Sequence, residues 1–118
     1  MSWTVLYHDA FMPEVDALPE AVQDALFATV ALLMTYGPAL GRPHADTLVG
    51  SKHANMKELR FQAENRAWRV AFAFDPVRRA ILLVAGNKAG VVQKRFYKRL
   101  IAKADSRFAE HLAWLEKD

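Results

Sequence analysis

The sequence predicts one α+β domain, residues 1–118, with the element order β-α-α-β-β-β-α. The chain has 118 residues, of which 53% are hydrophobic and 25% are charged, and this composition suits one compact domain. Apolar residues recur at helical spacing in two parts of the chain, and three strand-like runs lie between these parts. The connectors between the runs are short, so we expect the runs to pair as antiparallel neighbours.

The N-terminal third is expected to form a strand followed by two helices. Residues 3–7 alternate in the manner of a strand. Asp9 is a candidate cap for a short first helix, and Pro13 and Pro19 each suit the first position of a new helix. After Pro19, apolar residues recur at helical spacing until Gly37-Pro38, a pair that ends helices.

The rest of the chain is expected to form a loop, three strands and a long helix. Residues 37–54 are rich in Gly and Pro, which predicts a flexible loop with room for one short extended piece. The strand-like runs span residues 56–63, 67–74 and 80–85. From about residue 92 to 116, apolar residues return to steps of four, which predicts the C-terminal helix.

The composition excludes several classes of function. The chain has no cysteine, which excludes disulfides, a thiolate nucleophile and sulfur-ligated metal sites. Its four histidines are scattered without a metal-binding spacing, so we expect no metal and no other cofactor. The first residues lack the pattern of a secretory signal, and no apolar run reaches the roughly 20 residues that cross a bilayer. We therefore expect a cytoplasmic protein that has no membrane partner.

Charge is divided unevenly along the chain. Residues 1–59 carry three Lys or Arg against seven Asp or Glu, a net charge of −4, whereas residues 60–118 carry thirteen against six, a net charge of +7. Such a basic half attracts polyanions, although a solvated helix face is the plain alternative. The candidate RNA-binding residues of the C-terminal helix are Arg95, Lys98, Arg99, Lys103 and Arg107.

Two arginines of the predicted sheet form a second candidate site. Alternation places Arg60 on a polar face of its strand and Arg69 on a face shared with Ala71 and Ala73. We expect this face to be open to a ligand, with the two arginines together, because permanently charged guanidinium groups suit phosphate oxygens. The alternative is that they form separate surface ion pairs with Glu58 and Glu64.

Several short motifs, in this order, resemble the RelE/ParE superfamily of toxin–antitoxin toxins, in particular its HigB-like branch. The motifs are Lys57–Phe61 (KELRF), Trp68–Phe72 (WRVAF), Ile81–Val84 (ILLV), Gly86–Lys88 (GNK) and Lys94–Tyr97 (KRFY). The resemblance implies a twisted antiparallel sheet flanked by an N-terminal helical pair and a C-terminal helix. It also implies metal-independent cleavage of mRNA on translating ribosomes and neutralisation by a cognate antitoxin protein. Ribosome, mRNA and antitoxin are therefore the expected partners.

The resemblance also suggests site residues. The family's ELR arginine falls on Arg60, its YRV-type arginine on Arg69, and the basic residue after the last strand on Lys88. The family has an aromatic residue and paired lysines after that strand, which this chain lacks. Tyr97 or Lys94 is a candidate substitute, and Lys57, Lys88 and Lys94 are candidates for proton transfer.

Two other functions remain open at the level of sequence. The ParE branch of the superfamily is similar in fold and poisons DNA gyrase by binding it, without nuclease chemistry. The departure from the family pattern also leaves room for an inactive nucleic-acid-binding relic. Arginines that converge on a sheet face favour the nuclease, because binding to a protein target does not need them.

Overall fold

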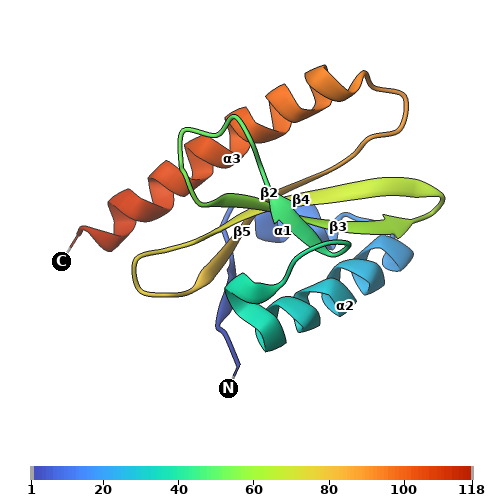
Figure 1. Ribbon diagram of the computed structural model, residues 1–118. Coiled ribbons are helices and arrows are strands. Elements are labelled where there is room, and N and C mark those ends of the chain that lie inside the picture. Colours follow the sequence, from blue (N-terminus) through green and yellow to red (C-terminus); the bar gives the residue numbers. More distant parts are fainter. Residues whose placement is uncertain (1, 118) are drawn as a thin grey trace.

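The computed structural model describes residues 2–117 and has a five-stranded sheet with helices on both faces (Figure 1). The elements in chain order are β1 Val5–Tyr7, α1 Phe11–Asp16, α2 Glu20–Tyr36, the 3-10 turn η1 Gly37–Ala39, β2 Ala45–Thr47, β3 Met56–Ala63, β4 Arg66–Phe74, β5 Ala80–Asn87 and α3 Gln93–Leu115. The predicted α+β class and the order of the predicted elements are confirmed. The short extended piece in the loop is β2.

The strand order in the sheet is β1-β5-β4-β3-β2. The pairs β3–β4 and β4–β5 are antiparallel, as the short connectors predict, and β2 also pairs antiparallel with β3. Strand β1 instead pairs in parallel with β5, so the sheet is mostly antiparallel. This edge pair is parallel because most of the chain lies between the two strands, and such a long crossover lets β1 run alongside β5.

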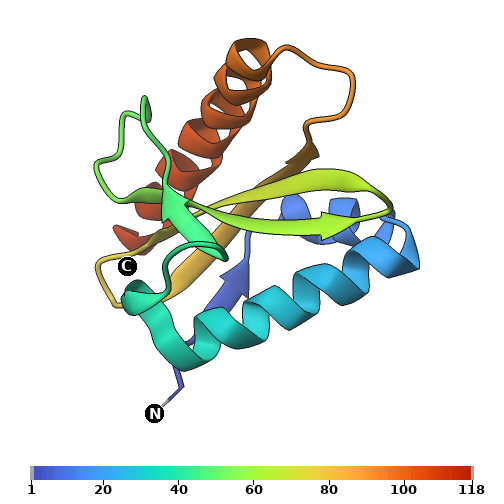
Figure 2. The same cartoon turned by 45° about the vertical axis from the view of Figure 1, so that its right-hand side comes forward.

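Two hydrophobic cores fill the space on the two faces of the sheet. On one face, α1 and α2 pack through Phe11, Leu26 and Leu33 against Val70 and Phe72 of β4. On the other face, α3 packs against the sheet, and Figures 1 and 2 show the two helical layers on opposite sides. Alternating β4 side chains thus enter different cores, which is why β4 is almost completely buried.

The face that carries Ala71 and Ala73 was predicted to be open to a ligand, and this prediction is wrong. Both alanines are fully buried in the second core, together with Phe96 and Leu100 of α3. Small side chains on the strand leave the room that the larger helix side chains fill. Near the first turns of α3, the same face carries the charged side chains of Glu58, Arg60 and Arg69, of which Arg60 is the most exposed.

The start of α1 also differs from the prediction. Its N-cap is Ala10, which makes no side-chain cap, and the imidazole Nδ1 of His8 accepts a hydrogen bond from the Ala10 amide at 3.0 Å. Asp9 is therefore not the cap. Pro13 is the third residue of α1 and Pro19 is the N-cap of α2, positions that tolerate proline because first-turn amides have no intrahelical partner. None of the helices in residues 2–117 has the length and hydropathy to cross a membrane.

Candidate functional site

Two arginines face each other across the central strands. Arg60 of β3 and Arg69 of β4 are direct cross-strand partners, so the register places two positive charges side by side. Their side chains are 21% and 7% exposed. Like charges opposite each other in a sheet destabilise it unless a counter-charge is present. The expectation that these arginines lie together is thus met in the structure.

Glu58 supplies the counter-charge. Its side chain is 5% exposed, and its Oε2 accepts a hydrogen bond from Arg60 Nη1 at 2.8 Å. Its Oε1 lies 3.8 Å from Arg69 Nε. Glu58 precedes Arg60 by two residues and lies on the same face of β3, so its carboxylate reaches both guanidinium groups. Two buried or half-buried cations therefore share one carboxylate.

Tyr97, in the first turns of α3, closes this arrangement. Its hydroxyl donates to Glu58 Oε1 at 2.8 Å and accepts from Arg69 Nε at 3.3 Å. Burial raises the pKa of Tyr97, and the hydrogen bond to Glu58 acts in the same direction, so the phenol stays protonated. Tyr97 is thus a hydrogen-bond donor that fixes Glu58, and it joins α3 to the sheet.

Lys88 brings a third positive charge to the same place. It follows β5, where its amide donates to the Ala67 carbonyl, and its Nζ lies 5.4 Å from the centre of the Tyr97 ring. Partial burial lowers the pKa of Lys88, and the charges of Arg69 and Arg60 lower it further against the opposing effect of Glu58. A lowered lysine pKa favours proton transfer near neutral pH.

The arginine–lysine cluster, defined here as Arg60, Arg69 and Lys88 around Glu58, has more positive than negative charge. In the described part of the chain, Arg60 makes a single side-chain hydrogen bond, to Glu58, and Lys88 makes one to Gln93. The remaining N–H groups of both are free to bind an anion. A phosphate group suits such a cluster because its oxygens accept several charge-assisted hydrogen bonds.

Gly86 allows α3 to pack close to the cluster. It is the cross-strand partner of Arg69, and a Cβ built on it would lie 2.9 Å from Phe96 Cε1. Phe96 is the residue before Tyr97, so this close approach of helix and strand sets the position from which Tyr97 reaches Glu58. A side chain at position 86 would push the start of α3 away from the sheet.

The other candidate residues lie elsewhere. Lys57 is on the opposite face of β3 from Glu58, and Lys94 is exposed on α3. Four of the five candidate RNA-binding residues are also exposed along α3, and they are Arg95, Lys98, Arg99 and Lys103.

Arg107 is engaged within the fold. Its Nη1 and Nη2 donate to the Glu14 carboxylate at 2.8 and 2.6 Å, and Nη1 also donates to the Leu83 carbonyl at 2.7 Å. One turn further along α3, His111 Nε2 lies 2.9 Å from Asp75 Oδ2. Arg107 and His111 therefore hold the second half of α3 to the rest of the domain, whereas the candidate residues Arg95, Lys98, Arg99 and Lys103 are exposed.

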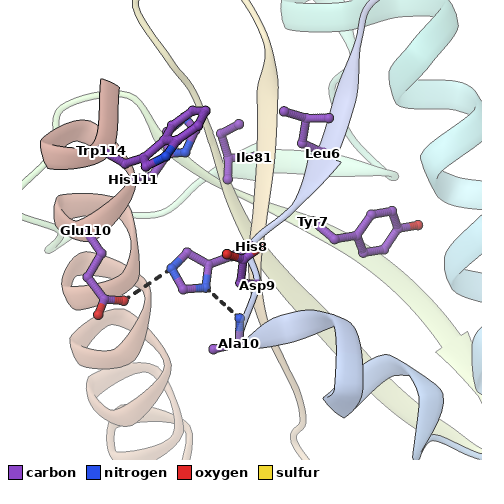
Figure 3. A pocket seen from close by; sticks show the side chains of 9 residues that line it. All are labelled: Leu6, Tyr7, His8, Asp9, Ala10, Ile81, Glu110, His111 and Trp114. Atoms are coloured by element: carbon purple, nitrogen blue, oxygen red, sulfur yellow. Dashed lines mark hydrogen bonds and ion pairs between the residues drawn. The ribbon is translucent and has the colours of Figure 1, made fainter. Parts of the chain in front are cut away.

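A separate cavity of about 500 Å³ lies between α3 and β1 (Figure 3). His8 points across it to Glu110, at 3.2 Å, and Leu6 and Trp114 line its outer part. It has Asp9 and Glu110 in its wall and neither Lys nor Arg, so it does not suit a phosphate. Residues 2–117 also contain no group of three or more His, Asp or Glu side chains placed to hold a metal ion.

Comparison with known proteins places the chain in a family. Residues 13–109 match the model of the phage-derived protein Gp49-like family. The chain belongs to the Gp49-like family. It is 48% identical over 103 residues to a Mycobacterium tuberculosis protein named "Putative toxin HigB2", and this match covers 86% of the chain and 51% of that protein. The chain thus spans about half the length of that relative.

Further matches agree with the Gp49-like assignment. A second M. tuberculosis protein, named "Putative toxin HigB3", is 42% identical over 106 residues, with 86% of this chain and 90% of the relative covered. A solved structure of an E. coli RelE toxin mutant in the free state has a TM-score of 0.62 at 10% identity and covers 87% of this chain and 97% of its own. The structural match shows the RelE-like fold, and membership of the HigB-like branch of the RelE/ParE superfamily is confirmed.

The roles of Glu58 and Gly86 beside the cluster were not predicted from the sequence. Glu58 was considered only as a surface ion-pair partner, although its neighbours in an alternating strand, Met56 and Arg60, share its face. One signal could have revealed the role of Glu58 as a shared counter-charge. It lies two residues before Arg60, and the neighbouring strand also carries an arginine. The contact between Gly86 and Phe96 depends on helix docking and leaves no local signal.

Proposed function

We propose that this Gp49-like protein is the toxin of a toxin–antitoxin pair and that it cleaves mRNA on the translating ribosome without a metal ion. The observation that carries the proposal is the convergence of Arg60, Arg69 and Lys88 around one buried carboxylate. The names of the two M. tuberculosis relatives support the toxin class, and a cognate antitoxin is the partner that this class implies.

The chemistry follows from what RNA cleavage requires. The 2′-oxygen of a ribose loses its proton and attacks the adjacent phosphorus, the P–O5′ bond breaks, and the leaving 5′-oxygen takes up a proton. Negative charge grows on the phosphoryl oxygens in the transition state. Arg60 and Arg69 are placed to stabilise this charge, because Glu58 and Tyr97 already hold the two guanidinium groups in position.

Lys88 is proposed as the group that transfers a proton. Its Nζ lies beside the two arginines, and its lowered pKa makes the exchange of a proton easier than for an ordinary lysine. Tyr97 is proposed as a positioning residue, since its hydroxyl is occupied by Glu58 and Arg69. The exposed cations of α3, which are Lys94, Arg95, Lys98, Arg99 and Lys103, are proposed to bind the phosphates of mRNA or ribosomal RNA.

The decisive experiment maps RNA 5′ ends in a reconstituted translation system after the purified protein is added, with and without ribosomes. We expect new ends only on translated message. Arg69→Ala should abolish them, because it removes a cation from the centre of the cluster. Arg78→Ala is the matched control, since Arg78 is an exposed arginine in the β4–β5 turn. Folding of each variant is checked by its thermal unfolding.

Three outcomes would overturn parts of the proposal. Intact message with the wild-type protein would exclude the nuclease, and gyrase-dependent DNA breaks in a parallel assay would then favour a ParE-like toxin. Cleavage of naked RNA would show that the ribosome is not required. Normal cleavage by a folded Arg69→Ala variant would remove the cluster from the mechanism.

A further inference from the structure

A second cavity, of about 610 Å³, lies between α2 and β3 and shares Arg60 and Arg69 with the arginine–lysine cluster. Its volume is within the range of small-ligand pockets, about 300–1,000 Å³. Helix α2 packs beside β3 on the face of the sheet opposite α3, as Figures 1 and 2 show. Arg60, Arg69 and Gln62 belong to the α3 face of the sheet and Phe61 to the α2 face, so the cavity reaches both faces at the edge of β3 beyond its pairing with β2.

One part of the cavity wall is apolar. Helix α2 contributes Ala25, Ala28 and Leu32, of which the two alanines have the smallest side chains. Strand β3 contributes Phe61, whose ring stacks on Trp68 with 6.5 Å between centroids and 5° between planes. Aromatic and aliphatic surfaces of this kind accept an unstacked nucleobase.

The opposite part of the wall is polar. Gln62 is exposed and carries both amide donors and an acceptor, which suit the edge of a base. Arg42, with a side chain that is 67% exposed, is held by Asp46 at 2.8 Å. A guanidinium group fixed in this way is able to stack on a base or contact a phosphate.

We propose that this cavity binds the base of the nucleotide whose phosphate Arg60 and Arg69 hold. The inference rests on the proposed RNA cleavage and adds a base subsite to it. The base lies against Phe61 and the alanines of α2, Gln62 contacts its edge, and the phosphate points toward the two arginines. The cavity would then determine which nucleotide is accepted beside the cleaved bond.

Two other cavities lack this combination. The cavity of Figure 3 has acidic residues where a nucleotide needs cations. The hollow along α3 is lined by Lys94, Arg95, Lys98 and Arg99 but has no aromatic ring, so it suits an RNA backbone rather than a base. Of these three cavities, the one beside α2 is lined by Arg60 and Arg69 together with an aromatic ring.

A binding experiment tests the base subsite without cleavage. The probe is an RNA trinucleotide with a 2′-deoxy sugar at the position to be cleaved, compared with a trinucleotide of equal charge that lacks that base. Methyl NMR signals of Ala28 and Leu32 should shift with the first probe and stay in place with the second. Equal shifts with both probes would overturn the proposal, since phosphates alone would then explain them.

A pair of alanine variants on α2 sharpens the test. Ala28→Leu fills part of the cavity without replacing an arginine, and Ala31→Leu adds the same side chain on an exposed part of α2 outside the cavity. We expect Ala28→Leu to weaken trinucleotide binding about tenfold, as expected for loss of one base contact, and Ala31→Leu to leave it unchanged. Cleavage sites mapped for Ala28→Leu should show an altered base preference.

The outcomes separate the base subsite from the proposed function. If the wild-type protein cleaves message but Ala28→Leu binds and cleaves like Ala31→Leu, the subsite is wrong and the nuclease stands. If the base-bearing probe binds beside α2 but message stays intact, the nuclease is wrong and the subsite stands. If Ala28→Leu and Ala31→Leu differ in thermal unfolding, the titration is repeated with Ala25→Val, which narrows the same cavity. Weaker binding by this variant supports the subsite, and unchanged binding contradicts it.

Discussion

Glu58 lies between two arginines that face each other across β3 and β4. Removing one partner of a buried ion pair leaves the other charge without compensation, which costs more than the pair contributes when intact. The same carboxylate also lowers the net positive charge that a phosphate would meet. Glu58 therefore stabilises the pair of arginines and competes with the proposed substrate for the guanidinium groups.

Glu58→Gln is expected to lower the free energy of unfolding by about 3 kcal/mol, because Arg60 and Arg69 lose their counter-charge. Millimolar inorganic phosphate should restore part of this loss, since an anion that binds the folded state stabilises it. Urea denaturation with and without phosphate measures both effects. Glu64→Gln, in the exposed β3–β4 turn, is the control. A Glu58→Gln variant as stable as wild type would contradict the assigned role.

Lys88 offers a pH-dependent test at the same scale. Its pKa lies below the ordinary value of 10.5 because of burial and then the charges of Arg69 and Arg60. Arg60→Gln removes one of these charges. The protonated form of Lys88 is then repelled less, so its pKa should rise toward 10.5. NMR titration of the Lys88 side chain measures the change. No change, or the same change in Arg78→Gln, would show that the arginines do not act on Lys88.

Helix α3 carries different kinds of residues in its two halves. Its first turns bring Tyr97 to the cluster and expose Arg95 and Arg99, whereas its second half is tied to the fold by Arg107 and His111. In the sequence, basic residues recur at steps of four along this helix and form one continuous basic stripe of Arg95, Arg99, Lys103 and Arg107. Packing divides the stripe, because only residues that pass α1 and the β4–β5 turn find acidic partners.

The ion pair between Arg107 and Glu14 predicts a specific acid dependence. The hydrogen bond from Arg107 lowers the pKa of Glu14 below its ordinary 4.5, so the pair contributes stability above that pH and loses it as pH falls through the lowered value. Glu14 is 42% exposed, so we expect Glu14→Gln to cost only about 1 kcal/mol at pH 7 and less in acid.

Urea denaturation of wild type and Glu14→Gln at pH 7 and below pH 4 checks this expectation. Glu116→Gln, which changes an exposed acid after the end of α3, is the control. A stability difference between wild type and Glu14→Gln that stays constant with pH would contradict the ionic contribution.

At the scale of the whole molecule, acidic and basic residues lie in different halves of the chain, with net charges of −4 for residues 1–59 and +7 for residues 60–118. The fold brings the basic half to one region, since β4, β5 and α3 are neighbours. The positive potential therefore surrounds the cluster and the exposed part of α3. Such a field attracts polyanions and is weakened by salt.

RNA binding should therefore weaken steeply as the salt concentration rises. A plot of the logarithm of the binding constant against the logarithm of the salt concentration should become less steep by about 0.7 for each phosphate contact that is removed. Arg99→Gln should lower the slope by about this amount, because Arg99 is exposed. Arg107→Gln should leave it unchanged, because Arg107 binds Glu14 and the Leu83 carbonyl. Fluorescence anisotropy with a labelled RNA over a salt series measures both, and equal effects of the two variants would contradict the division of α3.

Local sequence by itself determined the elements of this protein. The end of α2 at Tyr36 follows from Gly37-Pro38, and β3 spans Met56–Ala63 as alternation predicts. The family resemblance likewise depended on short motifs in a fixed order. These features are set by residues close together in the chain, whose periodicity and turn chemistry are visible without the fold.

Tertiary structure alone decided the environment of the site. The register places Arg60 opposite Arg69, α3 covers the face expected to be open, Glu58 becomes the shared counter-ion, and Arg107 is drawn to Glu14. Each of these results joins segments far apart in the chain. Charge compensation and burial depend on distances across such segments, and those distances are fixed only when the sheet and helices pack together.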